Sequence, residues 1–192
     1  MTRSPDDIRN ELLVVRCRRQ DASAWDELVR LYQDRMFYFV RRFVRDDDQA
    51  AVVMQDVWMQ VLRSLSFLKS TDRLTPWLYT IARRAVVNRY RREASDVGAA
   101  AAELSEANVD EEHEAFEQFE SAELVHFGLS RLDVASREVL TLHFLEAFSV
   151  AEIAGILEIP GGTVKSRLHR ARLELRQILD QESERRPQGA RS

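Results

Sequence analysis

Four polar side chains near the C-terminal end of the chain share one side of a helical pattern and could bind nucleic acid. At 100° per residue they lie opposite an apolar stripe, as on a helix with one buried face. Cations and hydrogen-bonding groups near the start of such a helix can enter a major groove and read base edges, although an ordinary solvated helix face has the same pattern. The polar side chains belong to Lys165, Ser166, His169 and Arg170, and the apolar stripe to Val164, Leu168, Ala171, Leu175 and Ile178.

A second candidate surface lies between Pro76 and Arg92, where four polar residues recur at helical spacing. Neighbouring arginines enlarge the positive field, and such arginines neutralise phosphates without reading much sequence. Trp77 and Tyr79 stand beside this stripe, and aromatic rings can stack on unpaired bases; burial in the core is the alternative that we favour for Trp77. The stripe consists of Thr80, Arg84, Asn88 and Arg91, and the neighbouring arginines are Arg83, Arg89 and Arg92.

The residue types that enzymes use are not arranged for catalysis. The sequence has neither a G-x-S-x-G nucleophile motif nor a G-x-x-x-x-G-K-[ST] phosphate loop. Its four histidines lack the spacing of metal ligands. Cys17 is the single cysteine, and packing in a core is its simplest role. We therefore expect no enzyme activity, no cofactor and no metal.

Helical periodicity dominates the first part of the chain, and no window alternates long enough to indicate a strand. The spacing of Ile8, Leu12 and Val15 predicts a short opening helix, and a long amphipathic helix follows from about residue 25 to residue 43. The third helix follows the acidic run 46–48 and is predicted to bury Val53, Val57, Val61, Leu65 and Leu68. A fourth helix begins near Pro76, a residue type that the first turn of a helix tolerates.

The second part predicts a helix-turn-helix. One helix runs from about Leu132 or Ser136 to Glu146, and a short helix follows at 149–157. Ser149 and Glu152 form an S-x-x-E capping box at the start of that short helix. A turn at 158–162, which contains glycine and proline, separates it from a longer basic helix that runs to about residue 179.

Composition and charge divide the chain into two folded parts and a connector. Its 192 residues are 45% apolar and 31% charged, as in ordinary globular domains. Residues 1–92 carry 18 basic and 12 acidic side chains, residues 93–128 carry 11 acidic and no basic ones, and residues 129–192 carry 10 basic and 9 acidic ones. We therefore predict an all-α fold of two small helical domains, at 1–92 and 124–192, joined by an acidic flexible linker at 93–123.

The same composition bears on where the protein acts. No apolar stretch is long enough to span a membrane, and the N-terminus lacks the pattern of a secretory signal. A lone cysteine cannot form an internal disulfide and suits a reducing compartment. We therefore expect no membrane insertion and a cytoplasmic location.

Together, these segments resemble the extracytoplasmic-function sigma factors of bacterial RNA polymerase, over about residues 20–92 and 125–180. AVVMQDVWMQVLRSL and TPWLYTIARRAVVNRYRR are similar to the family's first domain, which by this resemblance binds the polymerase clamp helices and opens the −10 promoter element. LDVASREVLTLHFLEAFSVAEIAGILEIPGGTVKSRLHRARLEL is similar to the last domain, which reads the −35 element and contacts the polymerase flap. The run GTVKSRLHRAR is the most specific part of the match.

The resemblance assigns roles to individual residues. Gln55, Asp56 and Trp58 match the signature at the core-polymerase contact. The segment Lys69–Thr75 matches the loop that captures a flipped-out −10 base, whose extraction costs roughly a few kcal/mol. The −10 set consists of Lys69, Ser70, Thr71, Asp72 and Arg73 in this loop and Thr80, Arg84, Asn88, Arg91 and Arg92 in the next helix; the −35 set consists of Thr163, Lys165, Ser166, Arg167, His169 and Arg170.

Several positions depart from the family's usual pattern. Ala51 and Val52 stand where an acidic pair is usual, which weakens the prediction of a charged polymerase contact. Arg84 and Asn88 stand where Asn and Asp are frequent, so we expect an unusual −10 preference. Glu158 stands in the turn where Gly is common, and a positive φ there would cost Glu roughly 1 kcal/mol. We therefore expect a remodelled turn.

The resemblance also implies partners. Core RNA polymerase, through its β′ clamp and β flap, and promoter DNA are expected, an anti-sigma factor is a further candidate, and the free chain is expected to be monomeric. Holding two modest DNA readers on one polymerase raises the effective concentration of the second contact, so the free factor should bind promoters poorly. The acids of the linker are expected to thread the polymerase near the RNA exit path, with a plain solvated tether as the alternative.

Two other classes of function remain open from the residues alone. A stand-alone helix-turn-helix regulator, with residues 1–92 sensing a signal, would bind palindromic sites as a dimer without polymerase. A protein that sequesters a partner by helix packing would need neither basic face. Loss of polymerase binding on changing Gln55 and Asp56 would favour the sigma factor.

Overall fold

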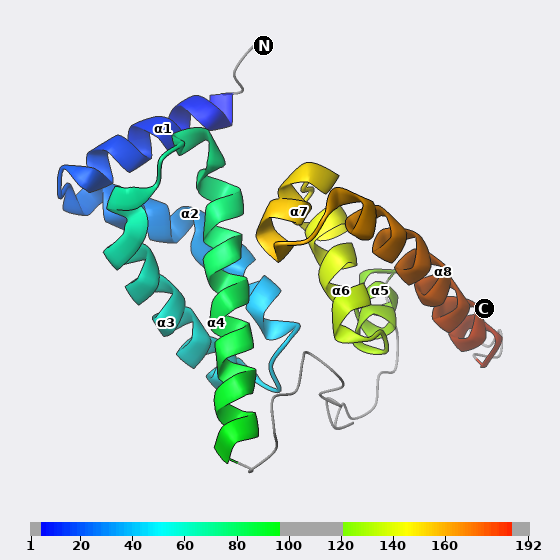
Figure 1. Cartoon of the computed structure of the whole chain (residues 1–192). Helices are drawn as coiled ribbons and strands as arrows, with labels where there is room; N and C mark the ends of the chain where they lie inside the picture. The colour runs from blue at the N-terminus through cyan, green and yellow to red at the C-terminus, as the bar shows by residue number, and fades with distance from the viewer. Residues whose placement is uncertain (1–4, 97–120, 186–192) are drawn as a thin grey trace, which may run out of the picture. The chain divides into compact units, whose positions relative to one another are not determined.

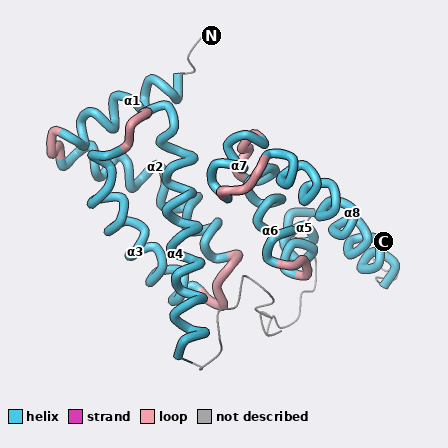
Figure 2. The backbone as a smooth tube through the Cα atoms, viewed as in Figure 1, coloured by secondary structure: helices cyan, strands magenta, loops and turns pink. Residues whose placement is uncertain are grey.

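The computed structural model describes residues 5–96 and 121–185, and the side chains of residues 7–92 and 124–182. Within these ranges it contains helices, turns and loops and no strand (Figure 1; Figure 2). The chain divides into two compact units, the first with α1 to α4 and the second with most of α5 to α8. The predicted all-α class with two helical domains is confirmed.

The predicted linker is described only at its two ends. The helix α4 continues to Asp96 and α5 begins at Ser121, so both helices extend into the range 93–123. The predicted passage of acidic residues through the polymerase falls mainly on residues 97–120, outside the described residues. In the described ranges, no helix is both long enough and apolar enough to cross a membrane.

The first unit buries the faces that α2, α3 and α4 turn toward one another, and α1 packs against α2. The start of α3 is capped by Asp46, whose side chain accepts a hydrogen bond from the Gln49 N–H at 2.7 Å. The apolar stripe predicted for this helix and the residues just after it is buried along its whole length. The elements are α1 (Pro5–Arg18), α2 (Ala22–Arg41), α3 (Asp47–Ser64), the 3-10 turns Leu65–Phe67 and Thr71–Arg73, and α4 (Leu74–Asp96).

The opening helix forms as predicted, but the face that it buries is a different one. Leu13, Val14 and Cys17 face the core, whereas Ile8 and Leu12 are exposed. The three residues whose spacing predicted this helix, Ile8, Leu12 and Val15, therefore do not form its buried face. A short helix with apolar residues on two opposite sides can bury either one, and contact with the other helices of the unit decides between them.

The second unit packs α5 and α6 against the long helix α8. Gly128 permits the close approach of α5, because a Cβ atom there would lie 2.6 Å from Leu175 Cδ1. The predicted helix ending at Glu146 corresponds to α6 and the π-helical turn that continues it, and α8 runs past the predicted end near residue 179. The elements are α5 (Ser121–Ser130), α6 (Val134–Leu140), the π-helical turn Thr141–Leu145, α7 (Val150–Leu157) and α8 (Gly161–Arg185).

A buried arginine fixes the end of α5 to the start of α6. The guanidinium of Arg137 donates to the carbonyl oxygens of Leu129 at 2.9 Å, Ser130 at 2.8 Å and Leu132 at 3.0 Å. Carbonyl groups at the end of a helix have no partner within that helix. Arg137 supplies one to the last turn of α5 and to the connection that follows.

Candidate nucleic-acid interface

Local hydrogen bonds build the turn between α7 and α8. The predicted capping box forms: the Ser149 N–H donates to the Glu152 carboxylate at 2.8 Å, and the Glu152 N–H donates to Ser149 Oγ at 3.3 Å. At the other end of α7, Glu158 has φ 57° and the Ile159 N–H bonds to the Ala154 oxygen at 3.1 Å. This is the Schellman pattern that normally uses glycine. The prediction of a remodelled turn is wrong, because Glu158 adopts the left-handed conformation itself.

The helix α8 exposes the polar face that its sequence predicts. Its first buried positions, Val164, Leu168 and Ala171, pack inside the second unit. The hydroxyl of Ser166 donates to the carbonyl oxygen of Thr163 at 3.0 Å, so it already has one local acceptor. Of the predicted −35 set, Lys165, Ser166, His169 and Arg170 are exposed, and Thr163 and Arg167 are half-buried.

Arg170 has an acidic neighbour within the unit, Asp133. Asp133 caps α6, and its carboxylate accepts from the Ser136 N–H and the Ser136 hydroxyl, both at 2.8 Å. Partial burial raises the pKa of Asp133, but these hydrogen bonds, that of the Ala135 N–H and the charge of Arg170 outweigh it and lower the pKa below its ordinary value. The positive charge of Arg170 is therefore partly balanced before any DNA is bound.

In the first unit, the polar stripe of α4 lies largely on the surface as predicted. Arg84, Asn88 and Arg91 are exposed, whereas Thr80 is half-buried and its hydroxyl donates to the Pro76 oxygen at 2.9 Å. Arg92 is also exposed.

The ion pair of Arg92 connects two predicted sites. Its guanidinium lies 3.4 Å from the carboxylate of Asp56 on α3. The structure thus brings one residue of the −10 set beside one residue of the polymerase set.

The aromatic residues of α4 are not both available for stacking. Tyr79 is fully buried, and its ring packs edge-on against Phe39 with centroids 5.2 Å apart. A stacking role for Tyr79 is therefore wrong, and Trp77 is half-buried. An exposed aromatic ring near the loop that precedes α4 is instead supplied by Phe67, which the sequence pattern did not single out.

The loop predicted to capture a base is an exposed turn between two buried leucines. Leu68 lies just before it and Leu74 is its last residue but one, and both side chains lie in the core. Its middle forms the 3-10 turn Thr71–Arg73, and the Ser70 hydroxyl donates to the Asp72 carboxylate. Lys69, Ser70, Asp72 and Arg73 are exposed, and Thr71 is half-buried.

The outer face of α3 carries the predicted polymerase contact and more apolar surface than expected. Gln55 and Asp56 are exposed, whereas Trp58 is half-buried and its indole N–H donates to the side chain of Gln33 on α2. Three large apolar side chains that the sequence reasoning missed share the exposed face. The sequence does contain a signal for them, because all three are apolar residues of α3 that do not belong to its predicted buried stripe. They are Val52, Met59 and Leu62.

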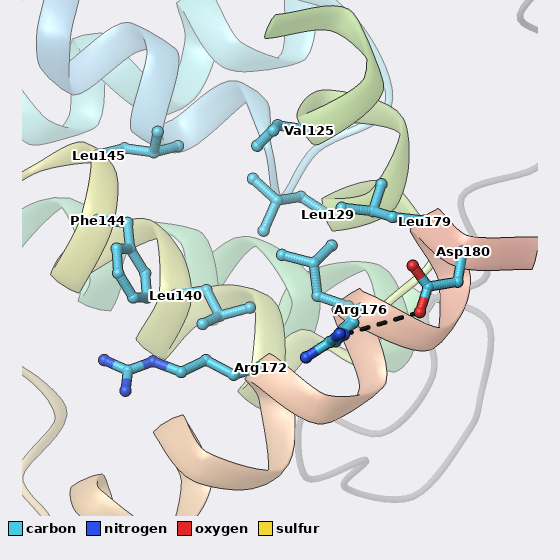
Figure 3. Close-up of a pocket in the computed structure, with 10 residues that line it drawn as sticks. Val125, Leu129, Leu140, Phe144, Leu145, Arg172, Arg176, Leu179 and Asp180 are labelled. Atoms are coloured by element: carbon cyan, nitrogen blue, oxygen red, sulfur yellow. Dashed lines mark ion pairs between the residues drawn. The ribbon is translucent and has the colours of Figure 1, made fainter. Parts of the chain in front are cut away.

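A groove of about 440 Å³ opens in the second unit between α5, the π-helical turn after α6 and the second half of α8 (Figure 3). The ring of Phe144 lies under the guanidinium of Arg172, 4.9 Å from its centroid, and Arg176 pairs with Asp180 at 3.8 Å. The floor is apolar and the charged groups belong to α8. The lining consists of Val125, Leu129, Leu140, Phe144, Leu145, Arg172, Leu175, Arg176, Leu179 and Asp180.

Both units match known sequence families. Residues 28–95 match Sigma-70 region 2, and residues 123–175 match Sigma-70, region 4. The chain is 33% identical to the RNA polymerase sigma-H factor of Pseudomonas aeruginosa over 174 residues, which cover 85% of this chain and 90% of that protein. It is 30% identical to the ECF RNA polymerase sigma-E factor of Escherichia coli K12 over 177 residues, which cover 87% and 92%.

Two solved structures share the fold. The sigma factor RpoE of Bartonella quintana, crystallised with the anti-sigma factor NepR, has a TM-score of 0.66 at 23% identity, over 81% of this chain and 96% of that one. CnrH in complex with the cytosolic domain of CnrY has a TM-score of 0.65 at 22% identity, over 89% and 97%. The two family matches and the sequence relatives together show that this chain belongs to the extracytoplasmic-function sigma factors of the sigma-70 family, which are transcription initiation factors and not enzymes.

Proposed function

We propose that this sigma factor binds core RNA polymerase, at the β′ clamp, through the outer face of α3. The observation that carries the proposal is the exposed apolar surface of Val52, Met59 and Leu62 beside Gln55 and Asp56. The helix already buries a complete stripe on its inner side, so the fold does not need these three side chains, and clustered exposed apolar residues mark interaction surfaces. An apolar contact also compensates for the acidic pair that is missing at positions 51 and 52.

Promoter recognition is divided between the two units in this proposal. The loop 69–75 and the exposed face of α4 bind and open the −10 element, with Arg84 and Arg91 neutralising phosphates. In the second unit, α8 enters the major groove of the −35 element. There Ser166 and His169 can read base edges, while Lys165 contributes mainly to phosphate binding.

The groove of the second unit is assigned to the polymerase β flap. Its apolar floor suits the apolar side of a helix, and Arg172 and Arg176 at its edge favour acidic residues on that helix. An anti-sigma factor would act by covering this groove or the outer face of α3. The factor acts in the cytoplasm and is monomeric when free.

A pair of matched substitutions tests the polymerase contact. Leu62 on α3 is 56% exposed and Leu12 on α1 is 58% exposed, so Leu62→Ser and Leu12→Ser remove the same side chain from equally exposed positions. Burying a leucine contributes about 1.5–3 kcal/mol. Affinity for core polymerase, measured by titration with a labelled chain, should therefore fall roughly tenfold to a hundredfold for Leu62→Ser and stay unchanged for Leu12→Ser.

Transcription from a library of genomic fragments then tests promoter selection. The complex of the chain with core polymerase should start transcripts at discrete sites and so reveal its promoters. Equal loss of polymerase affinity in both leucine variants would refute the α3 assignment. A chain that ignores polymerase but binds palindromic DNA tightly on its own would be the stand-alone regulator instead.

A further inference from the structure

We propose that Arg18 and Tyr32 are positioning residues for the loop 69–75, because each ties one end of that loop to the N-terminal helices. The inference rests on the proposed role of the loop in capturing a −10 base, and goes beyond it by naming the residues that hold the loop in shape. Neither residue belongs to the loop, and neither is among those expected to contact DNA or polymerase. Figure 2 shows the loop between α3 and α4 running beside α1.

The first end of the loop is held by Arg18. Its guanidinium donates to the carbonyl oxygen of Leu68, the residue just before Lys69. The side chain of Leu68 is buried at the same point. Backbone and side chain are thus both fixed where the chain leaves the core, and the last turn of α1 supplies the polar half of this attachment.

The second end is held by Tyr32, whose ring is buried. Its hydroxyl donates to Asn10 Oδ1 at 2.9 Å and lies 3.0 Å from Thr75 Oγ1. Because the single phenolic proton is used on Asn10, the Thr75 hydroxyl donates to Tyr32 in this arrangement. A residue of α1, a residue of α2 and the last residue of the loop therefore share one hydrogen-bonded chain.

Fixed ends matter because the middle of the loop is exposed. Lys69, Ser70, Asp72 and Arg73 point into solvent, and α1 packs against the turn Thr71–Arg73. A loop that had to become ordered on binding would lose affinity through the entropy of that ordering, whereas a loop already held at both ends would not. The two attachments pre-organise the exposed residues for a base that leaves the DNA stack.

Limited digestion with trypsin tests the attachments without DNA or polymerase, because Lys69 and Arg73 are cleavage sites within the loop. The full chain with Arg18→Ala or Tyr32→Phe should be cut about tenfold faster at these two sites. Cleavage after Arg45, in an exposed turn of the same unit, should not change and serves as the internal reference. Arg19→Ala, at the neighbouring exposed position, is the matched control, and Arg18→Lys should restore much of the protection.

The effect of the two attachments on promoter opening is tested in the complex of the chain with core polymerase. The promoter used is one that was found with the unchanged chain. A 2-aminopurine in the −10 non-template strand reports unstacking of the base. Arg18→Ala should slow the rise in fluorescence about tenfold while polymerase affinity stays the same, and Arg18→Lys should recover it. Unchanged cleavage at Lys69 and Arg73, or normal opening despite faster cleavage, would overturn the inference. Failure of the unchanged chain to open any promoter would instead refute the proposed function of the loop.

Discussion

Replacing Arg137 with methionine should destabilise the second unit and leave the first one unaffected. The Arg137 side chain is 5% exposed, and its guanidinium donates hydrogen bonds to the backbone oxygens of Leu129, Ser130 and Leu132. Methionine fills a similar volume but has no donor. The substitution therefore removes the hydrogen bonds while creating little empty space.

The expected loss follows from which oxygen atoms are left without this donor. The Leu129 oxygen keeps a bond from the Leu132 N–H at 3.3 Å, so the main effect falls on the oxygens of Ser130 and Leu132. A buried carbonyl that loses its partner costs about 1–3 kcal/mol, and access of water to the Ser130 oxygen reduces that figure, so we expect about 3 kcal/mol in total. A domain of this size is stable by only about 5 kcal/mol, so more than half of its stability would disappear.

The distribution of aromatic residues allows the two units to be followed separately. All three tryptophans, Trp25, Trp58 and Trp77, lie in the first unit. Tryptophan fluorescence therefore reports unfolding of that unit, whereas far-ultraviolet circular dichroism reports both. In urea, the fluorescence midpoint of the Arg137→Met chain should stay in place, and the remaining dichroism transition should move down by roughly 2–3 M.

Arg176→Met is the matched control, because Arg176 is an exposed arginine on α8 of the same unit. Its effect should stay within about 0.5 kcal/mol, as is usual for surface positions. Two results would refute the reasoning: a loss below about 1 kcal/mol for Arg137→Met, or a fluorescence transition that moves as far as the dichroism transition. The first would mean that water or a rearranged helix end satisfies the carbonyl groups. The second would mean that the units do not unfold separately.

Three further predictions follow from single residues. Cys17 is fully buried, and burial raises the pKa of its thiol to about 11, so iodoacetamide at mildly alkaline pH should modify it only after urea unfolds the first unit; rapid modification of the folded chain would contradict its placement. Glu158→Gly should raise the stability of the folded chain by about 0.5–1 kcal/mol, because glycine adopts φ 57° without strain, and an unchanged or lower dichroism midpoint would count against this. The pKa of Asp133 is lowered in the folded chain, so its ionised carboxylate stabilises the fold above the unfolded pKa of about 3.9 and this contribution is lost as the pH falls through the folded pKa. The stability of Asp133→Asn should accordingly fall less steeply with acid than that of the unchanged chain, and parallel pH profiles would show that the cap is not ionised.

Features that depend on neighbouring residues in the chain could be predicted from the sequence. The capping box of Ser149 and Glu152 and the buried stripe of α3 follow from spacing within a few turns of one helix. The polar face of α8 follows in the same way, and Lys165 and His169 lie on the surface as expected. In each case the buried side carries apolar residues at regular helical spacing, so periodicity is sufficient to identify it.

Features that depend on distant residues could not be predicted. The helix α1 has two apolar sides, and only its contacts with the rest of the unit show that Leu13 is buried and Leu12 is not. Tyr79 lies next to a polar stripe in the sequence, but Phe39 on another helix holds its ring in the core. The groove is formed by three separate segments and requires the close approach of α5 at Gly128. The periodicity of apolar residues in the sequence does not indicate which segments lie so close together.

The helix α8 carries two surfaces on different turns, and this separation bears on how such a factor could be controlled. Lys165, Ser166, His169 and Arg170 form the exposed polar face, whereas Arg172, Leu175 and Leu179 line the groove. Because one continuous helix holds both, a polymerase segment in the groove, as proposed above, would fix the direction of the turns that are proposed to read DNA without covering them. A partner that occupied the groove could thus prevent assembly with polymerase and still leave Lys165 and His169 exposed. Inhibition of that kind would not require competition with DNA, since in the proposed mechanism two weak readers would select a promoter only when one polymerase holds them together.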